Sequence, residues 1–102
     1  MKVLAIDFDG VIHDYEHPIE GRRMGAIING ARQALEFLKK RGDRIIVFSV
    51  WGHDKGRKTI ADFMNYYYLP FDEITNIKPQ ADYYIDDRGI KFTNWEEVLK
   101  QL

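Results

Sequence analysis

Two pairs of aspartates directly follow apolar runs near opposite ends of the sequence. Asp7 and Asp9 come at the end of the first run, and Asp86 and Asp87 come at the end of the last. If these runs are neighbouring parallel strands, the four carboxylates converge at one edge of a sheet, where their mutual repulsion requires a bound cation or protonation. Mg²⁺ is typically held by one or two carboxylates together with substrate phosphate oxygens. The pattern therefore predicts Mg²⁺-dependent phosphate chemistry.

The apolar runs alternate with amphipathic segments, as in an α/β protein. Continuous apolar runs, typical of strands buried on both faces of a parallel sheet, occupy residues 3–6, 45–48 and 83–85, with 71–74 as a weaker candidate. Helices are expected over residues 28–41, 55–68 and 94–102. The sequence thus predicts one domain, 1–102, with a Rossmann-like three-layer α/β/α fold around a mostly parallel sheet. Ligands of such sheets bind beyond the carboxyl ends of the strands, where the aspartate pairs lie.

Composition excludes several other classes of protein. With 102 residues, 45% of them hydrophobic, and a net charge of -1, the chain has enough apolar material for one core and lacks the broad basic field of a nucleic-acid-binding domain. It contains no cysteine, so disulfides and thiolate metal sites are excluded, and its three histidines lack the spacing of a zinc site. No apolar run approaches the ~18 residues of a membrane span. We expect a cytoplasmic protein without a membrane partner.

Two further motifs extend the pattern: Ser49 follows the second apolar run, and Lys78 stands before Pro79. With them the chain resembles the haloacid dehalogenase (HAD) superfamily of phosphatases. In that family the first strand ends in D-x-D, the second ends in Ser or Thr, a lysine follows, and an acidic pair closes the site. The matching segments, in the family's order over nearly the whole chain, are Asp7-Phe8-Asp9-Gly10-Val11-Ile12, Ser49, Ile77-Lys78-Pro79 and Asp86-Asp87. D-x-D alone is common by chance, but the four motifs in order are a specific signal.

The resemblance implies a small, capless HAD-like phosphoric monoester hydrolase. Asp7 would be the nucleophile that forms an aspartyl-phosphate. Asp9 would protonate the leaving group and later take a proton from the attacking water. Ser49, helped by the backbone N–H groups of Val50 and Trp51, would bind the phosphoryl oxygens.

The remaining motifs imply the charge balance of the site. Lys78 would bind substrate and keep Asp7 ionised. Asp86 would coordinate Mg²⁺ together with the Asp7 carboxylate and the Asp9 backbone carbonyl. Asp87 would bind a metal-bound water or orient Lys78. The expected metal ligands are therefore Asp7, Asp9, Asp86 and Asp87.

Structural roles are the alternative for each motif. The first two aspartates could merely cap the turn before Gly10, a serine after a strand is often structural, and a lone lysine is usually solvated. Arg88 could pair with the acidic groups or face solvent. His13 and His53 lie in loops expected to flank the site, where they could touch substrate or face water.

The interval from Gly10 to Asn29 has room for a short flap but not for a cap domain, so we expect an open site. An open site suits a bulky phosphorylated substrate, such as a nucleotide, a nucleic-acid end or a protein, unless a homo-oligomer covers it. Nonselective hydrolysis of small phosphates is also open. The other functions that fit are a phosphotransferase and a non-catalytic module that binds Mg²⁺ and phosphate. A receiver domain is disfavoured, because its phosphorylated aspartate would end the middle strand, where Ser49 stands.

Overall fold

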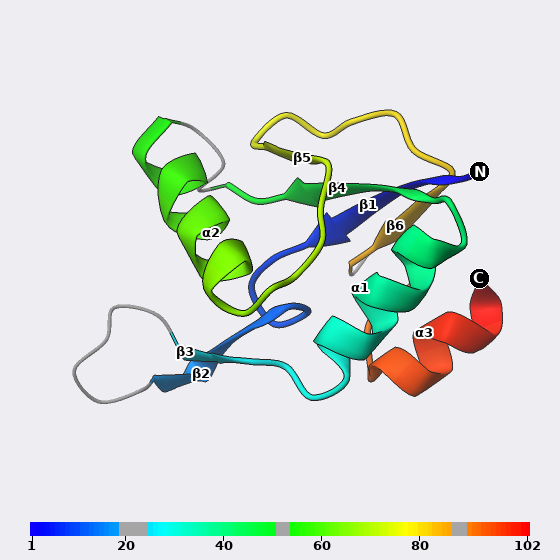
Figure 1. Ribbon diagram of the computed structural model, residues 1–102, viewed down its shortest axis with the longest axis horizontal. Coiled ribbons are helices and arrows are strands. Elements are labelled where there is room, and N and C mark those ends of the chain that lie inside the picture. Colours follow the sequence, from blue (N-terminus) through cyan, green and yellow to red (C-terminus); the bar gives the residue numbers. More distant parts are fainter. Residues whose placement is uncertain (19–24, 51–53, 87–89) are drawn as a thin grey trace.

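A computed structural model of the chain describes residues 1–18, 25–50, 54–86 and 90–102. Its central sheet has four parallel strands in the order β5-β4-β1-β6 (Figure 1). These strands are β1 (Val3–Asp7), β4 (Arg44–Phe48), β5 (Glu73–Thr75) and β6 (Tyr83–Ile85). The other elements are a β2 (His13–Pro18) and β3 (Gly25–Ile27) hairpin and the helices α1 (Ala31–Lys40), α2 (Asp54–Tyr66) and α3 (Trp95–Gln101). The predicted α/β class and Rossmann-like parallel sheet are confirmed.

The helices begin and end at local sequence signals. α3 starts after Asn94, whose side-chain oxygen accepts the Glu97 N–H at 2.9 Å, as is typical of an asparagine that caps the start of a helix. α1 is followed by Gly42 at φ +92°, a left-handed conformation that glycine adopts without steric cost. In the described part of the chain, no helix has the length and apolar character needed to cross a bilayer.

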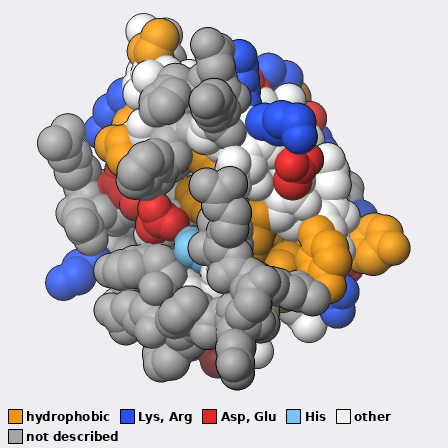
Figure 2. All heavy atoms as spheres, turned by 90° about the vertical axis from the view of Figure 1, so that its left-hand side faces the viewer, with side chains coloured by type: hydrophobic (Ala, Val, Ile, Leu, Met, Phe, Trp, Pro, Cys, Tyr) orange, Lys and Arg blue, Asp and Glu red, His pale blue; other side chains and the backbone are white. Residues whose placement is uncertain are grey.

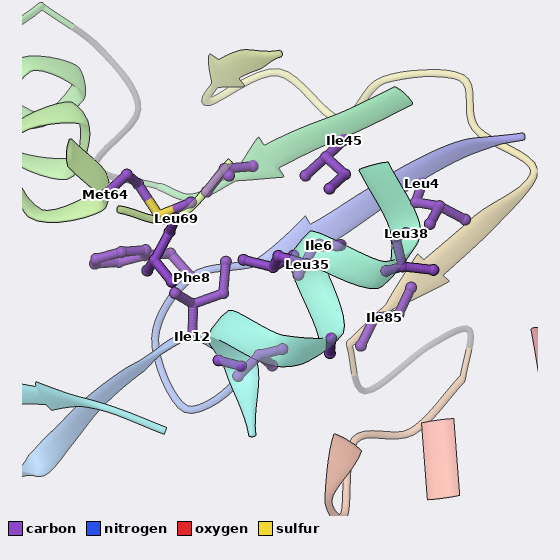
Figure 3. Close-up of a cluster of buried hydrophobic side chains, with 14 of the residues drawn as sticks. Leu4, Ile6, Phe8, Ile12, Leu35, Leu38, Ile45, Met64, Leu69 and Ile85 are labelled. Atoms are coloured by element: carbon purple, nitrogen blue, oxygen red, sulfur yellow. The ribbon is translucent and has the colours of Figure 1, made fainter. Parts of the chain in front are cut away.

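The hydrophobic core lies between one face of the sheet and all three described helices. Register places Leu4 beside Ile45 and Ile6 beside both Val47 and Ile85, so these buried side chains share a face. Figure 3 shows this cluster beneath α1. The buried helix residues of the same core are Ala31, Ala34, Leu35, Leu38, Ile60, Phe63, Met64, Trp95 and Val98. Each fully buried Leu or Ile stabilises the fold by about 1.5–3 kcal/mol.

The second face of the sheet is covered by the connection between β5 and β6. Ala5 and Tyr84 are partners on this face. The Tyr84 hydroxyl donates a hydrogen bond to the carbonyl oxygen of Pro79 at 2.6 Å. The predicted α/β/α arrangement has a layer on each face of the sheet. On this face the segment around Pro79 forms that layer, and the described helices lie on the first face.

Three aspartates that directly precede β4, β5 and β6 connect the strands at the amino-terminal edge of the sheet. The carboxylate of each aspartate accepts a hydrogen bond from a backbone N–H, either in a neighbouring strand or directly before that strand. Such bonds to a charged acceptor are stronger than bonds between neutral groups. The bonds run from Lys2 to Asp43 at 3.0 Å, from Ile45 to Asp72 at 2.8 Å and from Val3 to Asp82 at 2.6 Å. These carboxylates are structural, and they lie at the opposite edge from the aspartates that follow strands.

Candidate functional site at the carboxyl edge of the sheet

Three of the predicted site residues stand at the carboxyl ends of adjacent parallel strands, and so at the same edge of the sheet. Asp7 is the last residue of β1 and is the register partner of Phe48, which Ser49 follows. Asp86 follows Ile85 on β6, the strand on the other side of β1. Figure 2 looks onto this edge and shows acidic side chains beside a histidine. The parallel sheet thus brings together the first aspartate of the first motif, the serine and the first aspartate of the last motif.

The turn after Asp7 directs the first motif along this edge. The Phe8 carbonyl accepts the N–H groups of Ile12 and His13 at 2.9 Å each, and the Gly10 N–H donates to the His13 carbonyl at 2.8 Å. Gly10 has φ +81°, which a residue with a side chain adopts only with strain. None of these bonds uses the backbone carbonyl of Asp9, so that oxygen stays a candidate ligand.

The Asp7 carboxylate and the Ser49 backbone are held by bonds at their own strand ends. Asp7 Oδ1 accepts the N–H of Phe8 at 2.8 Å. Ser49 is buried, and its N–H donates to the Thr75 carbonyl at 3.0 Å. These two bonds therefore fix the positions of Asp7 and Ser49 at the carboxyl ends of β1 and β4.

The carboxylate of Asp9 is bonded to His13, one of the two histidines that the sequence places beside the site. Asp9 Oδ1 lies 2.8 Å from His13 Nδ1, and the Gly25 N–H donates to His13 Nε2 at 2.8 Å. His13 is the first residue of β2 and is only 6% exposed, so it does not face water, which was one of the two roles left open for it by the sequence. The i,i+4 spacing of Asp9 and His13 across the Gly10 turn was the available signal.

Lys78 is exposed on the loop after β5 and packs against an aromatic ring. Its Nζ atom lies 4.5 Å from the centroid of Tyr84, close enough for a cation–π interaction. The Tyr84 backbone pairs with Ala5, two residues before Asp7 on the same face of the sheet. Lys78 thus packs on the same face of the sheet as Ala5 and Asp7.

The donors at this edge fit Mg²⁺ rather than a softer metal. Among the described residues, no three His, Asp or Glu side chains lie close enough together to share an ion. The expected set includes only two described carboxylates, those of Asp7 and Asp86, because Asp9 would contribute its carbonyl and Asp87 lies outside the described residues. All of these donors are oxygens, and Mg²⁺ usually keeps several waters beside one or two carboxylates.

The other predicted residues divide between described and undescribed positions. Val50 is exposed directly after Ser49. Trp51, His53 and Arg88 lie outside the described residues, as does Asp87.

Lowered pKa values occur among the structural carboxylates of the amino-terminal edge. Burial raises the pKa of Asp43, but the hydrogen bonds from Arg41 and the Lys2 N–H and the Arg41 charge outweigh it, so the pKa is lowered. Burial likewise raises the pKa of Asp72, but the hydrogen bonds from Lys39 and the Ile45 N–H outweigh this effect, so the pKa of Asp72 is also lowered. A low pKa here reports strand anchoring rather than catalysis.

Comparison with known proteins supports the fold. The chain is similar to the solved structure of a conserved protein from Bacteroides thetaiotaomicron, with a TM-score of 0.78 and 24% identity over 98% of this chain and 88% of the other. A target protein from Vibrio cholerae matches with a TM-score of 0.62 and 22% identity over 98% of this chain and 95% of the other. No protein-family model and no curated protein matches the sequence. At these identities the likeness shows the fold alone.

Proposed function

We propose that this protein is a Mg²⁺-dependent phosphomonoester hydrolase that acts through an aspartyl-phosphate on Asp7. The proposal rests on one observation. Asp7, Ser49 and Asp86 stand at the carboxyl ends of three adjacent parallel strands, and Asp9 stands two residues after Asp7. The resemblance of the four motifs to the HAD superfamily supports the same reaction.

The proposed chemistry has two steps. The Asp7 carboxylate attacks phosphorus as the bond to the leaving-group oxygen breaks, and Asp9 gives its proton to that oxygen. Asp9 then takes a proton from the water that attacks the aspartyl-phosphate, which releases inorganic phosphate and restores Asp7. Ser49 and Lys78 bind phosphoryl oxygens. When bound, Mg²⁺ neutralises negative charge between the nucleophile and the phosphate, and the residues that would hold it are Asp7, Asp86 and, through its carbonyl, Asp9.

The surroundings of the edge favour a substrate with a substantial organic part. Val50 follows Ser49, and Ile77 comes two residues after Thr75, whose carbonyl accepts the Ser49 N–H. Both side chains are largely exposed, at 75% and 74%. Apolar side chains next to a phosphate site can contact a nucleoside or another organic group. A phosphorylated nucleotide or nucleic-acid end is the substrate class we would test first.

The experiment is a screen of phosphorylated metabolites and 5′- and 3′-phosphorylated oligonucleotides with and without Mg²⁺. We expect phosphate release only with Mg²⁺, and none from Asp7→Asn. Asp82→Asn is the matched control, because it removes a carboxylate charge at the opposite edge while keeping an acceptor for the Val3 N–H.

Each of the other outcomes of the screen would argue for a different function or against the proposed nucleophile. Transfer of the phosphoryl group to an added alcohol in preference to water would indicate a phosphotransferase. Mg²⁺-dependent binding of phosphate compounds without turnover would indicate a binding module. Equal activity in Asp7→Asn and the wild type would contradict the proposed nucleophile.

A further inference from the structure

One histidine joins the proposed acid to the β2–β3 hairpin through both of its ring nitrogens. His13 Nδ1 lies 2.8 Å from Asp9 Oδ1, and His13 Nε2 lies 2.8 Å from the backbone nitrogen of Gly25. Gly25 is twelve residues further along the chain, at the start of β3. A side chain bound at both ends in this way has one orientation.

The Gly25 bond fixes which nitrogen of His13 carries the proton. A backbone N–H can only donate, so Nε2 must accept and therefore has no hydrogen. In the neutral ring the hydrogen is then on Nδ1, where it points to Asp9 Oδ1. The partner on one nitrogen thus sets the tautomer at the other.

Two aromatic side chains hold the plane of the His13 ring. Phe8, which stands between Asp7 and Asp9, stacks on it with centroids 5.1 Å apart and an interplanar angle of 13°. Phe63 of α2 meets it edge-on at 5.3 Å and 80°. Because the ring is buried and packed on two sides, it cannot turn to give Asp9 its other nitrogen.

We infer that His13 is a positioning residue for Asp9, an inference that rests on the proposed function. The N–H donated to Oδ1 occupies that oxygen, so a proton on the Asp9 carboxyl resides on Oδ2. His13 therefore determines which oxygen delivers the proton to the leaving group and in what direction. The Asp9 side chain is 36% exposed, so it can reach a substrate while its other oxygen is held.

The rival explanation is that His13 only anchors the hairpin through Gly25. Two conservative variants separate the two bonds. The side-chain nitrogen of His13→Asn lies at about the same distance from the backbone as Nδ1, so this variant keeps a donor for Asp9 and loses the Gly25 acceptor. The side-chain oxygen of His13→Gln reaches as far as Nε2, so this variant keeps the acceptor and loses the donor.

The test measures kcat/KM on an alkyl phosphate, which needs a protonated leaving group, and on an aryl phosphate, which needs little protonation. We expect His13→Gln to lose about 10- to 100-fold on the alkyl substrate, the usual effect of removing an orienting partner, and much less on the aryl substrate. His13→Asn should lose little on either. In an Asp9→Asn background, His13→Gln should have no further effect on the alkyl substrate, because the acid that it orients is gone.

Several results would overturn the inference alone. Equal losses on both substrates in both variants would assign His13 to hairpin anchoring, as would an undiminished effect of His13→Gln in the Asp9→Asn background. A long-range ¹H–¹⁵N NMR spectrum of the wild type gives a readout independent of activity and of variant folding, and a proton on Nε2 would contradict the assigned tautomer. A wild type that hydrolyses neither substrate class would instead overturn the proposed function, and this inference with it.

Discussion

Asp82 and Val3 form a reciprocal pair at the start of β1: the Asp82 carboxylate accepts the Val3 N–H at 2.6 Å, and the Asp82 N–H donates to the Val3 carbonyl at 2.7 Å. Asp7 lies at the other end of the same strand. An aspartate that precedes a strand of this sheet thus joins it to its neighbour, whereas Asp7 and Asp86 lie at the carboxyl edge, where we propose that the chemistry takes place. This division supplies structural controls for each site variant.

The two aspartates of the first motif should fail in different ways. Asp7→Asn should abolish phosphoryl transfer on all substrates and leave no aspartyl-phosphate on the protein, because an amide is not a nucleophile here. Asp9→Asn should lose about 10²- to 10⁴-fold on alkyl phosphates and less on aryl phosphates. Steady-state kinetics and mass spectrometry of the trapped protein check both. The same factor lost by Asp9→Asn on both substrate classes would show that Asp9 is not the leaving-group acid.

Mg²⁺ should stabilise the folded protein through Asp86. A ligand that binds only the folded state at about 100 times its Kd adds about 2.7 kcal/mol, and 1 kcal/mol moves the Tm of a domain of this size by roughly 4–8 °C. Thermal melts with and without Mg²⁺ should therefore differ by many degrees in the wild type and in Asp82→Asn. Asp86→Ala should respond little. A full response in Asp86→Ala would exclude that carboxylate as a ligand.

The sequence was sufficient to predict the strands that carry the site. β1, β4 and β6 are continuous apolar runs, and parallel strands bring whatever follows them to one edge, so the positions of Asp7, Ser49 and Asp86 follow from the strand pattern. β5 was the weaker candidate, because its buried side chain, Ile74, stands between Glu73 and Thr75 and gives little apolar signal.

The hydrogen bonds of the site could not be predicted in the same way. The Asp9–His13 contact depends on a turn whose Phe8 carbonyl accepts several N–H groups, and on a third partner, Gly25, from a separate strand. Such a contact is decided by packing between segments rather than by any periodicity. The packing of Lys78 on Tyr84 has the same origin, since the loop after β5 carries no helical or strand pattern.

The ring of Tyr84 should be needed to position Lys78. Tyr84→Leu removes the cation–π contact, which at exposed sites is worth about 0.5–1 kcal/mol, so KM should rise by a few fold. Tyr84→Phe keeps the ring and loses only the bond to Pro79, so it should raise KM less. Inhibition by inorganic phosphate should weaken in parallel, because both effects pass through the lysine. An unchanged KM in Tyr84→Leu, with a normal fold by circular dichroism, would show that the contact between Lys78 and Tyr84 does not contribute to substrate binding.

Acid should destabilise the fold through the carboxylates of the amino-terminal edge. The folded-state pKa values of Asp43 and Asp72 lie below that of an unfolded aspartate, about 3.9, so these groups bind fewer protons when folded. Their stabilisation is therefore fully present above about pH 4 and is lost as the pH falls through the folded pKa values. Urea unfolding at pH 7 and pH 3 should show a loss of stability that is smaller in Asp43→Asn and Asp72→Asn, because an amide does not titrate. At pH 7, Asp43→Ala should cost about 1–3 kcal/mol, because it leaves the Lys2 N–H and the Arg41 guanidinium without their acceptor. Equal losses between pH 7 and pH 3 in the wild type and both Asn variants would assign the acid sensitivity to other groups.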